Sequence, residues 1–381
     1  MSTPSSLRAK SAAASMERRP VRLQQRGPPT AAMRARQSET RRWAAAQGSA
    51  ASGDAPQAML AKIPAPAAAP HTTLTIAMGD PESSEMGVVG NAFKKYVEDK
   101  TNGAIQVVCI YGGSPGDDEG ERFRKVQKGT LDMALGGIAN IVPLEKKLGL
   151  LTLPYLFANL NEVVAGTNGA PAELLNKYAT EAGFRILTWT YTGFRFISND
   201  KHPITKLSDM KGLKFRVPQS AVMIATYKAF GAIPSLIPWS MTFNALQSGD
   251  VDGQCYGYIG FRAMKFNEAN QRYLTEVHYT YHLQPLVISE RVFEKLTPEV
   301  RQILIDAGKY AQEKSLLFQV EQAEASKREL VAGGLKVSQL EDEDQWKKVA
   351  IEKVWPEMAD FVGGKDAINE YLKACGKQPW N

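Results

Sequence analysis

The stretch that decides the fold is residues 212–256, GLKFRVPQSAVMIATYKAFGAIPSLIPWSMTFNALQSGDVDGQCY. In its first segment apolar residues alternate with Lys214 and Arg216, which is the pattern of a half-buried strand with both basic side chains on the face away from the core. Pro218 ends this strand, because a proline has no N–H for the ladder. A helical segment follows, then a second strand over 233–237 and another short helix. Such alternation, with short turns, predicts an α/β sheet.

The N-terminal part of the folded chain repeats this alternation. Strands are expected over 73–78, 105–110 and 131–135, with a helix between each pair. A β-α-β unit requires parallel strands and a right-handed crossover. Ligands of such sheets bind beyond the carboxyl ends of the strands. This rule makes Asp80 and Gly137, which follow two of the strands, candidate ligand-binding residues.

One long helix is expected to connect two domains. It begins with Thr297 as N-cap and Pro298 at the first helical position, and Gly333 ends it. A helix over 298–332 would be about 52 Å long at ~1.5 Å per residue, which exceeds one small domain. We therefore expect it to lie across two domains. A coiled-coil arm is a weaker interpretation, because no a/d heptad is sustained.

Composition limits the function classes. The length of 381 residues suffices for two domains. Residues 1–70 hold 11 Lys or Arg against 3 acidic residues, a balance of +8, so the formal charge of +6 leaves −2 for the rest. The body shows no basic stripe with interleaved aromatics, and we expect no nucleic-acid partner. No run of about 18 apolar residues occurs, so we expect no transmembrane helix.

The N-terminal tail, residues 1–71, is predicted to be disordered, because it is rich in Ala, Arg, Ser and Pro. Export would require an apolar stretch after a basic start, and no leader is clearly recognisable. The pair Arg41-Arg42 is faintly similar to a twin-arginine leader. A miscalled start codon or shifted frame and an organelle transit peptide are the other interpretations.

Enzyme, cofactor and metal motifs are not found. The sequence has no G-x-S-x-G elbow and no P-loop, so no cofactor is expected. His278 and His282 lie in an alternating HYTYH run that predicts a strand, where that spacing would not place two metal ligands together. Asp117, Asp118 and Glu119 are interpreted as N-terminal helix charges rather than a cation site. The three cysteines, Cys109, Cys255 and Cys375, cannot form a disulfide framework and are expected to be small buried apolar residues.

The order of short motifs along the chain resembles a known family. In residues 212–256 these are G-x-K-x-R-V-P, a Gly-Ala-x-Pro turn and A-L-Q-x-G-x-V-D-G-Q. Others are G-x-R (Gly193, Arg195), the GDD turn (116–118), G-T-L-D (129–132) and K-F-x-E (265–268). Together, from about residue 73 to the C-terminus, they are similar to the extracytoplasmic solute-binding subunit of TRAP transporters, the DctP family.

The resemblance implies a fold and a function. The fold is α/β, two-lobed and periplasmic-binding-protein-like (type II-like), with the long helix spanning both lobes. Lobe I is expected to comprise 72–193 plus 282–320, and lobe II 194–281 plus 321–381. The protein would bind an organic acid between the lobes and deliver it to a TRAP permease in the membrane. It would act as an exported, periplasmic binding protein and not as an enzyme. A monomer is expected in preference to a dimer. A small-molecule enzyme or a stand-alone ligand sensor on the same fold is the alternative.

The resemblance also assigns site residues. Arg216 would anchor the solute carboxylate, because a guanidinium presents a planar fork that matches two carboxylate oxygens. Arg195 matches a second arginine of the family. Gln219 would contact the ligand or cap the following helix. Trp239 would form an apolar wall of the site, or else belong to the core.

Departures from the family pattern bear on the ligand. The family commonly shows D-G-Q-E-N, whereas this chain has Cys255 and Tyr256 at the last two positions. Gly137 stands where sugar-acid binders tend to carry a polar contact. Fewer polar partners predict an acid that is smaller or more apolar than a sialic or hexuronic acid.

Overall fold

The computed structural model describes residues 72–113 and 118–381. The chain divides into two units, 1–64 and 65–381, and all described residues lie in the second. The predictions for the tail 1–71, including Arg41-Arg42, and for the start of the GDD turn at 116–117 lie outside the described residues. Everything below concerns the second unit.

The first sheet has five strands in the order β2-β1-β3-β10-β4. β1 pairs in parallel with β2 and β3, as the β-α-β pattern predicts, whereas β10 is antiparallel to β3 and β4. The part of the chain around this sheet is called lobe I below. Its strands are β1 (Thr72–Met78), β2 (Ile105–Ile110), β3 (Met133–Leu135), β4 (Phe184–Phe194) and β10 (Tyr281–Ser289).

Amphipathic helices cover this sheet on both faces. Helix α2 (Glu85–Lys100) buries the apolar stripe of Val89, Phe93 and Val97 under β1 and β2. Ser84 caps it by accepting a hydrogen bond from the Gly87 N–H. On the opposite face lie three further helices, α3 (Glu119–Lys128), α4 (Leu160–Gly166) and α5 (Gly169–Glu181). The carboxyl ends of β1 and β3 therefore stay free for a site.

The second sheet has six strands in the order β11-β9-β5-β8-β6-β7. The part of the chain around it is called lobe II. β6 is parallel to β7 and β8, which confirms the α/β sheet predicted from residues 212–256. The strands are β5 (Phe196–Asn199), β6 (Lys214–Val217), β7 (Ile233–Leu236), β8 (Gly253–Tyr256), β9 (Tyr273–Glu276) and β11 (Lys336–Gln339). The helices are α6 (Ala221–Ala229), α7 (Thr242–Ser248) and α8 (Tyr258–Ala263).

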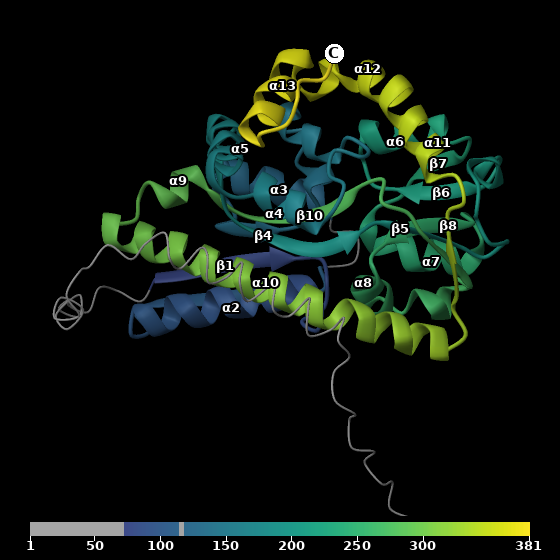
Figure 1. Cartoon of the computed structure of the whole chain (residues 1–381). Coiled ribbons are helices and arrows are strands. Elements are labelled where there is room, and N and C mark those ends of the chain that lie inside the picture. The colour runs from purple at the N-terminus through teal and green to yellow at the C-terminus, as the bar shows by residue number, and fades with distance from the viewer. Residues whose placement is uncertain (1–71, 114–117) are drawn as a thin grey trace, which may run out of the picture. The chain divides into compact units, whose positions relative to one another are not determined.

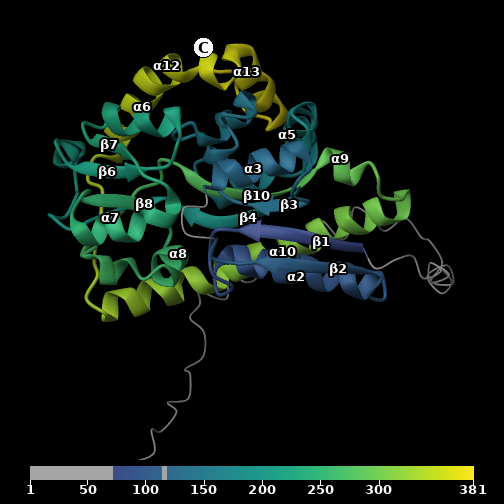
Figure 2. The ribbon, with the colours of Figure 1, turned by 180° about the vertical axis from the view of Figure 1, so that it is seen from behind.

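A single helix, α10 (Pro298–Ala332), runs under both lobes as predicted (Figure 1). It packs against α2 and β4 in lobe I and against α8 in lobe II. Thr297 caps it by accepting from the Val300 N–H. Gly308 allows close approach to β4, because a Cβ at this position would lie 2.1 Å from the Leu187 carbonyl oxygen. Figure 2 shows the same crossing from behind.

The C-terminal helices differ from the expected lobe assignment. Residues 321–381 were expected in lobe II, but α13 (Gly364–Ala374) packs against lobe I: Tyr371 donates to the Gly166 carbonyl at 2.8 Å, and Tyr178 donates to Glu370 at 2.7 Å. The reason is that α13 is amphipathic, and its apolar face completes the core of lobe I. The remaining elements are α9 (Glu290–Phe293), α11 (Glu343–Val349), α12 (Trp355–Met358), a π-helical turn (Ala350–Val354) and 3₁₀ turns at Ile138–Asn140, Lys146–Thr152, Leu207–Met210, Trp239–Met241, Phe266–Ala269 and Asp360–Val362.

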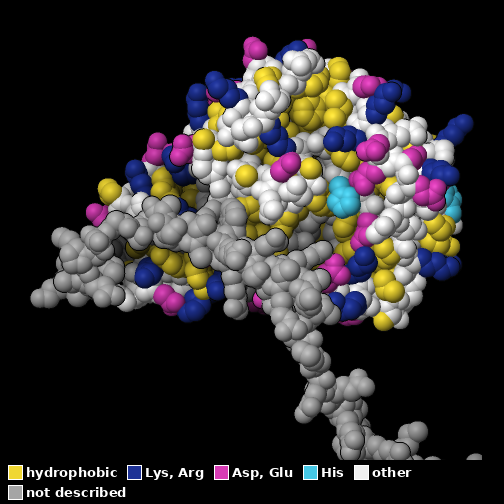
Figure 3. Space-filling model, in the orientation of Figure 1, with side chains coloured by type: hydrophobic (Ala, Val, Ile, Leu, Met, Phe, Trp, Pro, Cys, Tyr) yellow, Lys and Arg dark blue, Asp and Glu magenta, His cyan; other side chains and the backbone are white. Residues whose placement is uncertain are grey.

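The surface carries charges of both signs. Figure 3 shows Lys and Arg side chains interspersed with Asp and Glu on one face of the molecule. This pattern agrees with the small net charge of the body. Within residues 72–113 and 118–381, no helix combines the length and the apolar character needed to cross a membrane.

Candidate functional site

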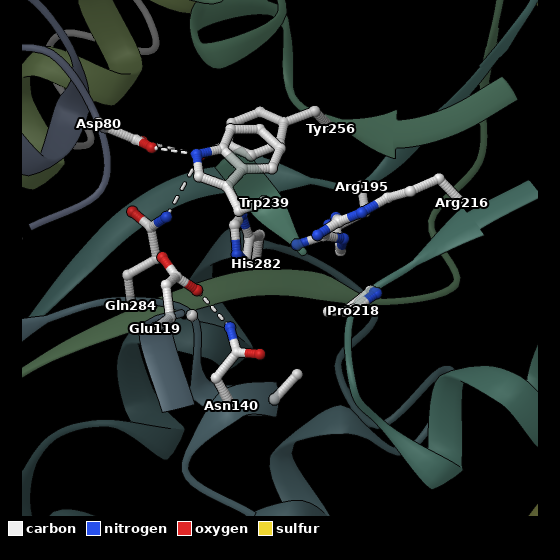
Figure 4. Close-up of a pocket in the computed structure, with 12 residues that line it drawn as sticks. Asp80, Glu119, Asn140, Arg195, Arg216, Pro218, Trp239, Tyr256, His282 and Gln284 are labelled. Carbon is white, nitrogen blue, oxygen red and sulfur yellow. Dashed lines mark hydrogen bonds between the residues drawn. The ribbon is translucent and has the colours of Figure 1, made fainter. Parts of the chain in front are cut away.

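A small cavity lies between the two sheets and takes its walls from both lobes (Figure 4). Its volume is about 30 Å³. A space of this size has room for about one or two water molecules. The structure therefore shows the two lobes closed upon the site. The lining residues are Asp80, Glu119, Gly137, Ala139, Asn140, Arg195, Arg216, Pro218, Trp239, Tyr256, His282 and Gln284.

Arg216 reaches the cavity from β6. Leu213, Phe215 and Val217 belong to the core of lobe II, so Arg216 lies on the strand face away from the core, as predicted. Arg216 is nevertheless only 4% exposed, because it faces the closed cavity, whereas Lys214 is exposed. Its Nε donates to the Ile237 carbonyl at 2.9 Å, and its guanidinium lies 5.4 Å from the Trp239 ring centre. Burial, followed by the positive charge of Arg195, lowers its pKa to about 10.

Arg195 lies beside it, where the chain passes from β4 to β5. Its Nε contacts the Cys255 sulfur at 3.1 Å, and its Nη2 donates to the Cys255 carbonyl at 3.1 Å. Arg195 is 6% exposed. Neither Arg195 nor Arg216 forms an ion pair with a carboxylate of the described residues. Two buried guanidiniums that face one cavity without an ion-paired carboxylate make it a candidate site for an anion.

Asp80 connects the two lobes. It follows β1, and both of its oxygens accept hydrogen bonds from lobe II: from Trp239 Nε1 at 2.8 Å and from the Tyr256 hydroxyl at 3.2 Å. Its side chain is buried. Burial, reinforced by the negative charge of Glu119, raises the pKa of Asp80 to about 7. The Asp80 carboxyl group therefore connects the two lobes across the cleft, and its charge changes near neutral pH.

Trp239 and Tyr256 form one aromatic wall. Their rings stack with centres 5.2 Å apart and planes 22° apart. The Tyr256 hydroxyl accepts from Gln284 Nε2 at 3.2 Å. The predicted apolar wall at Trp239 is thus in the cavity, and Tyr256 adds a hydroxyl that is already engaged by two partners.

Glu119 and Asn140 form the opposite wall and were not predicted from the sequence. Glu119 begins α3, accepts a hydrogen bond from Asn140 Nδ2, and lies 3.7 Å from Arg122 Nη2. Burial raises the pKa of the Glu119 carboxyl. The sequence pattern predicts this glutamate only as a helix-terminal charge. The sequence signal that could have identified Glu119 as a site residue is its position after β2, at the carboxyl edge of the first sheet.

His282 is a further lining residue that sequence reasoning did not assign to the ligand. The prediction that His278 and His282 share a strand is wrong: His282 lies in β10, but His278 lies in the preceding loop, 3.2 Å from a Glu343 oxygen. Burial, followed by the charges of Arg195 and Arg216, holds the pKa of His282 well below its usual range. The imidazole is therefore neutral. No group of three His, Cys, Asp or Glu suited to a metal occurs in the part of the chain that the structure describes.

Of the two remaining predicted site residues, Gly137 lines the cavity and Gln219 does not. Gly137 is in the wall, where a Cβ would lie 3.3 Å from His282 Nε2, so the glycine preserves cavity volume. Gln219 is exposed and is not brought to the cavity. It does not cap α6 either, because Ser220 is the N-cap and accepts from the Met223 N–H.

Comparisons with known proteins agree on one family. The model of bacterial extracellular solute-binding protein, family 7 (DctP), matches residues 76–360. A solute-binding protein of Verminephrobacter eiseniae is 34% identical over 248 residues, which is 64% of this chain and 72% of that protein. The 2,3-diketo-L-gulonate-binding periplasmic protein of Escherichia coli is 26% identical over 60% of this chain and 70% of its own length.

Solved structures show the same fold. A TRAP periplasmic solute-binding protein of Ralstonia eutropha with bound (S)-2-acetolactate superposes with a TM-score of 0.74 at 28% identity, covering 80% of this chain and 99% of that one. A second such protein, from Polaromonas, holds D-erythronate and has a TM-score of 0.74 at 26% identity, with 81% and 99% coverage.

Proposed function

The chain belongs to the DctP family of bacterial extracellular solute-binding proteins, and we propose that it binds a compact organic acid between its lobes and delivers it to a TRAP-type membrane permease. The observation that carries this proposal is the pair of buried guanidiniums, Arg195 and Arg216, which face one cavity without a carboxylate partner. Proteins of this family bind solutes for transporters and are not enzymes, and they act outside the cytoplasm. We infer that this chain acts in the periplasm, as a monomer rather than a dimer.

The geometry around Arg216 suits a carboxylate. Its Nε is engaged by the Ile237 carbonyl, which fixes the plane of the fork. Its two Nη groups have no hydrogen-bond partner among the described residues. A carboxylate accepts two parallel bonds from such a fork, and these charge-assisted bonds are stronger than neutral ones. Arg195 adds a second positive charge beside the same position.

The opposite wall suits hydroxyl or keto groups of the acid. The Glu119 carboxylate and the Asn140 amide lie across the cavity from the aromatic wall (Figure 4). Carboxylate and amide oxygens accept hydrogen bonds from hydroxyls, and the amide NH₂ donates to a carbonyl. The stacked Trp239 and Tyr256 narrow the space for a long polyhydroxy chain. These contacts support a small hydroxy or keto acid, as in the two solved relatives, which hold acetolactate and erythronate.

Capture and release require the lobes to move. The closed cavity of about 30 Å³ is too small to hold an organic acid, so the Asp80 bonds to Trp239 and Tyr256 must break before a solute enters. Closure then removes water around the arginines, and the interaction between carboxylate and guanidinium becomes stronger in the lower dielectric. α10 spans both lobes and α13 ties the C-terminus to lobe I.

A ligand screen tests the proposal. Thermal-shift measurements would compare small hydroxy and keto acids, aromatic acids, and sialic and hexuronic acids at equal concentration. We expect stabilisation by compact acids; stabilisation by sialic or hexuronic acids alone would contradict the proposed ligand class. Stabilisation by no acid would contradict the binding function. Native mass spectrometry of the carried ligand identifies the solute, and an unchanged ligand mass after incubation separates a binding protein from an enzyme.

A further inference from the structure

Cys255 contacts a ligand-facing arginine through both its side chain and its backbone. It lies in β8 directly before Tyr256 and is 1% exposed. Its sulfur lies 3.1 Å from Arg195 Nε, and its carbonyl accepts from Arg195 Nη2 at 3.1 Å. β8 pairs with β5, which begins one residue after Arg195, so the two strands hold both residues in register. Cys255 is buried in the core of lobe II, as predicted, and in addition it contacts Arg195.

Two buried tyrosines approach the same sulfur from other elements. Tyr227 belongs to α6 and Tyr279 to the loop before β10, and their hydroxyl oxygens are 3.0 Å apart. Both hydroxyls lie close enough to the Cys255 sulfur to lower the pKa of its thiol. The bond between the two tyrosines uses one hydroxyl proton, so the Arg195 guanidinium and at most one phenol can donate to the sulfur. A neutral thiol is a weak acceptor, whereas a thiolate accepts strongly from such donors.

We propose that Cys255 is a thiolate that positions Arg195, compensating its buried charge and fixing the direction of its guanidinium toward the ligand cavity. This role rests on the proposed function, in which Arg195 faces the solute. The remaining donors of Arg195 then point into the cavity, because Nε and Nη2 are engaged by the same cysteine.

The electrostatics of the surrounding groups support an ionised sulfur. Burial raises the pKa of the Cys255 thiol, but the Arg195 charge, the nearby hydroxyls of Tyr227 and Tyr279 and the contact with Arg195 Nε outweigh burial and hold this pKa below its ordinary range. Arg216, on the neighbouring β6, adds a second positive charge. Burial, together with the charge of Cys255, raises the pKa values of both tyrosines, so both remain protonated donors.

The charge balance of the site also favours an ionised Cys255 sulfur. A buried guanidinium without a counter-charge is strongly unfavourable, and no carboxylate of the described residues pairs with Arg195. A thiolate in direct contact supplies that counter-charge without filling the cavity, since Cys255 is not one of the lining residues. The opposite case is a neutral cysteine that only fills space.

Ultraviolet titration distinguishes the two cases without any ligand. In a Cys109→Ser/Cys375→Ser variant Cys255 is the one remaining cysteine, and the thiolate absorbance near 240 nm can be followed from about pH 5 to 9. We expect the thiolate signal at pH 7 and its loss on unfolding, because the pKa of an ordinary thiol is about 8.5. Arg195→Gln should move the midpoint upward by about one pH unit or more, whereas the control Arg262→Gln, an arginine paired with Glu329, should not. A midpoint at or above the ordinary value in the folded protein would overturn the proposal.

A double-mutant cycle in thermal unfolding tests the positioning role. At pH 8 Cys255→Ala should lower the melting temperature by about 5 °C or more, and by less than half of that in an Arg195→Gln background. A lowered folded-state pKa stabilises above the unfolded pKa, so the difference between wild type and Cys255→Ala should shrink as pH falls through the folded pKa. Equal effects of Cys255→Ala in both backgrounds would overturn the coupling. Neither measurement uses an organic acid, so failure here leaves the ligand screen as a separate test of the proposed function.

Discussion

Arg216→Lys is the sharpest test of how the acid is held. The substitution keeps one positive charge but replaces the planar fork by a point charge. In the structure Arg216 uses Nε for the Ile237 carbonyl and leaves both Nη groups for the solute. A lysine ammonium at the end of a flexible stem can serve the carbonyl or the solute, but it cannot present two parallel bonds to a carboxylate. The contact over the Trp239 ring, 5.4 Å from the guanidinium, also changes.

The expected loss of binding free energy follows from disrupting one fully desolvated contact between a guanidinium and a carboxylate. Arg216 is 4% exposed, so the lost bonds are not replaced by water at the surface. Disrupting a buried charge pair costs roughly 2 to 4 kcal/mol of binding free energy. At ~1.4 kcal/mol per tenfold this corresponds to a dissociation constant about 30 to 1,000 times higher.

Isothermal titration calorimetry with the acid found by the ligand screen measures this change. Arg262→Lys is a matched control, because Arg262 pairs with Glu329 on α10 and does not line the cavity. We expect the control to bind with nearly wild-type affinity. An affinity of Arg216→Lys within threefold of wild type would refute the reasoning, since the fork would then contribute nothing.

Three further predictions concern Asp80, the aromatic wall formed by Trp239 and Tyr256, and the long helix α10. Burial raises the pKa of Asp80 in the folded protein from 3.8 to about 7, so the contribution of this group to stability is fully present below pH 3.8 and is lost as pH rises to about 7. Asp80→Asn should therefore reduce the pH dependence of the melting temperature over that range. An unchanged pH profile of the melting temperature would contradict this assignment. Tyr256→Asn removes the stack on Trp239 and the bond to Asp80 and should weaken acid binding by roughly 1 to 3 kcal/mol, measured by calorimetry; tighter binding of a compact acid would count against the aromatic wall. Gly308→Ala should destabilise the protein by about 1 to 3 kcal/mol in denaturant unfolding, because its methyl group would lie 2.1 Å from the Leu187 oxygen, whereas the control Gly333→Ala meets nothing closer than 3.4 Å.

Local patterns were sufficient for much of the fold. The strands and helices of residues 212–256, the β-α-β order of lobe I and the bounds of α10 follow from periodicity, caps and proline or glycine positions, which act over a few residues. Asp80 and Gly137 were predicted as site residues because they follow strands of a parallel sheet, and both line the cavity. The alternation gave the direction of Arg216, away from the core, but it could not show that the closed cleft buries this side chain, because that burial comes from the other lobe.

By itself, then, the sequence determined the order of elements, the helix that crosses the lobes and the two arginines of the site, because these depend on local periodicity and on motif order. Only the tertiary structure decided which distant groups meet. Asp80 bonds to Trp239 and Tyr256 across 159 and 176 residues, α13 docks on lobe I rather than lobe II, and Cys255 lies against Arg195. No local signal marks these contacts, because a side chain's partners, its burial and hence its charge state are properties of the packed lobes and not of its own segment.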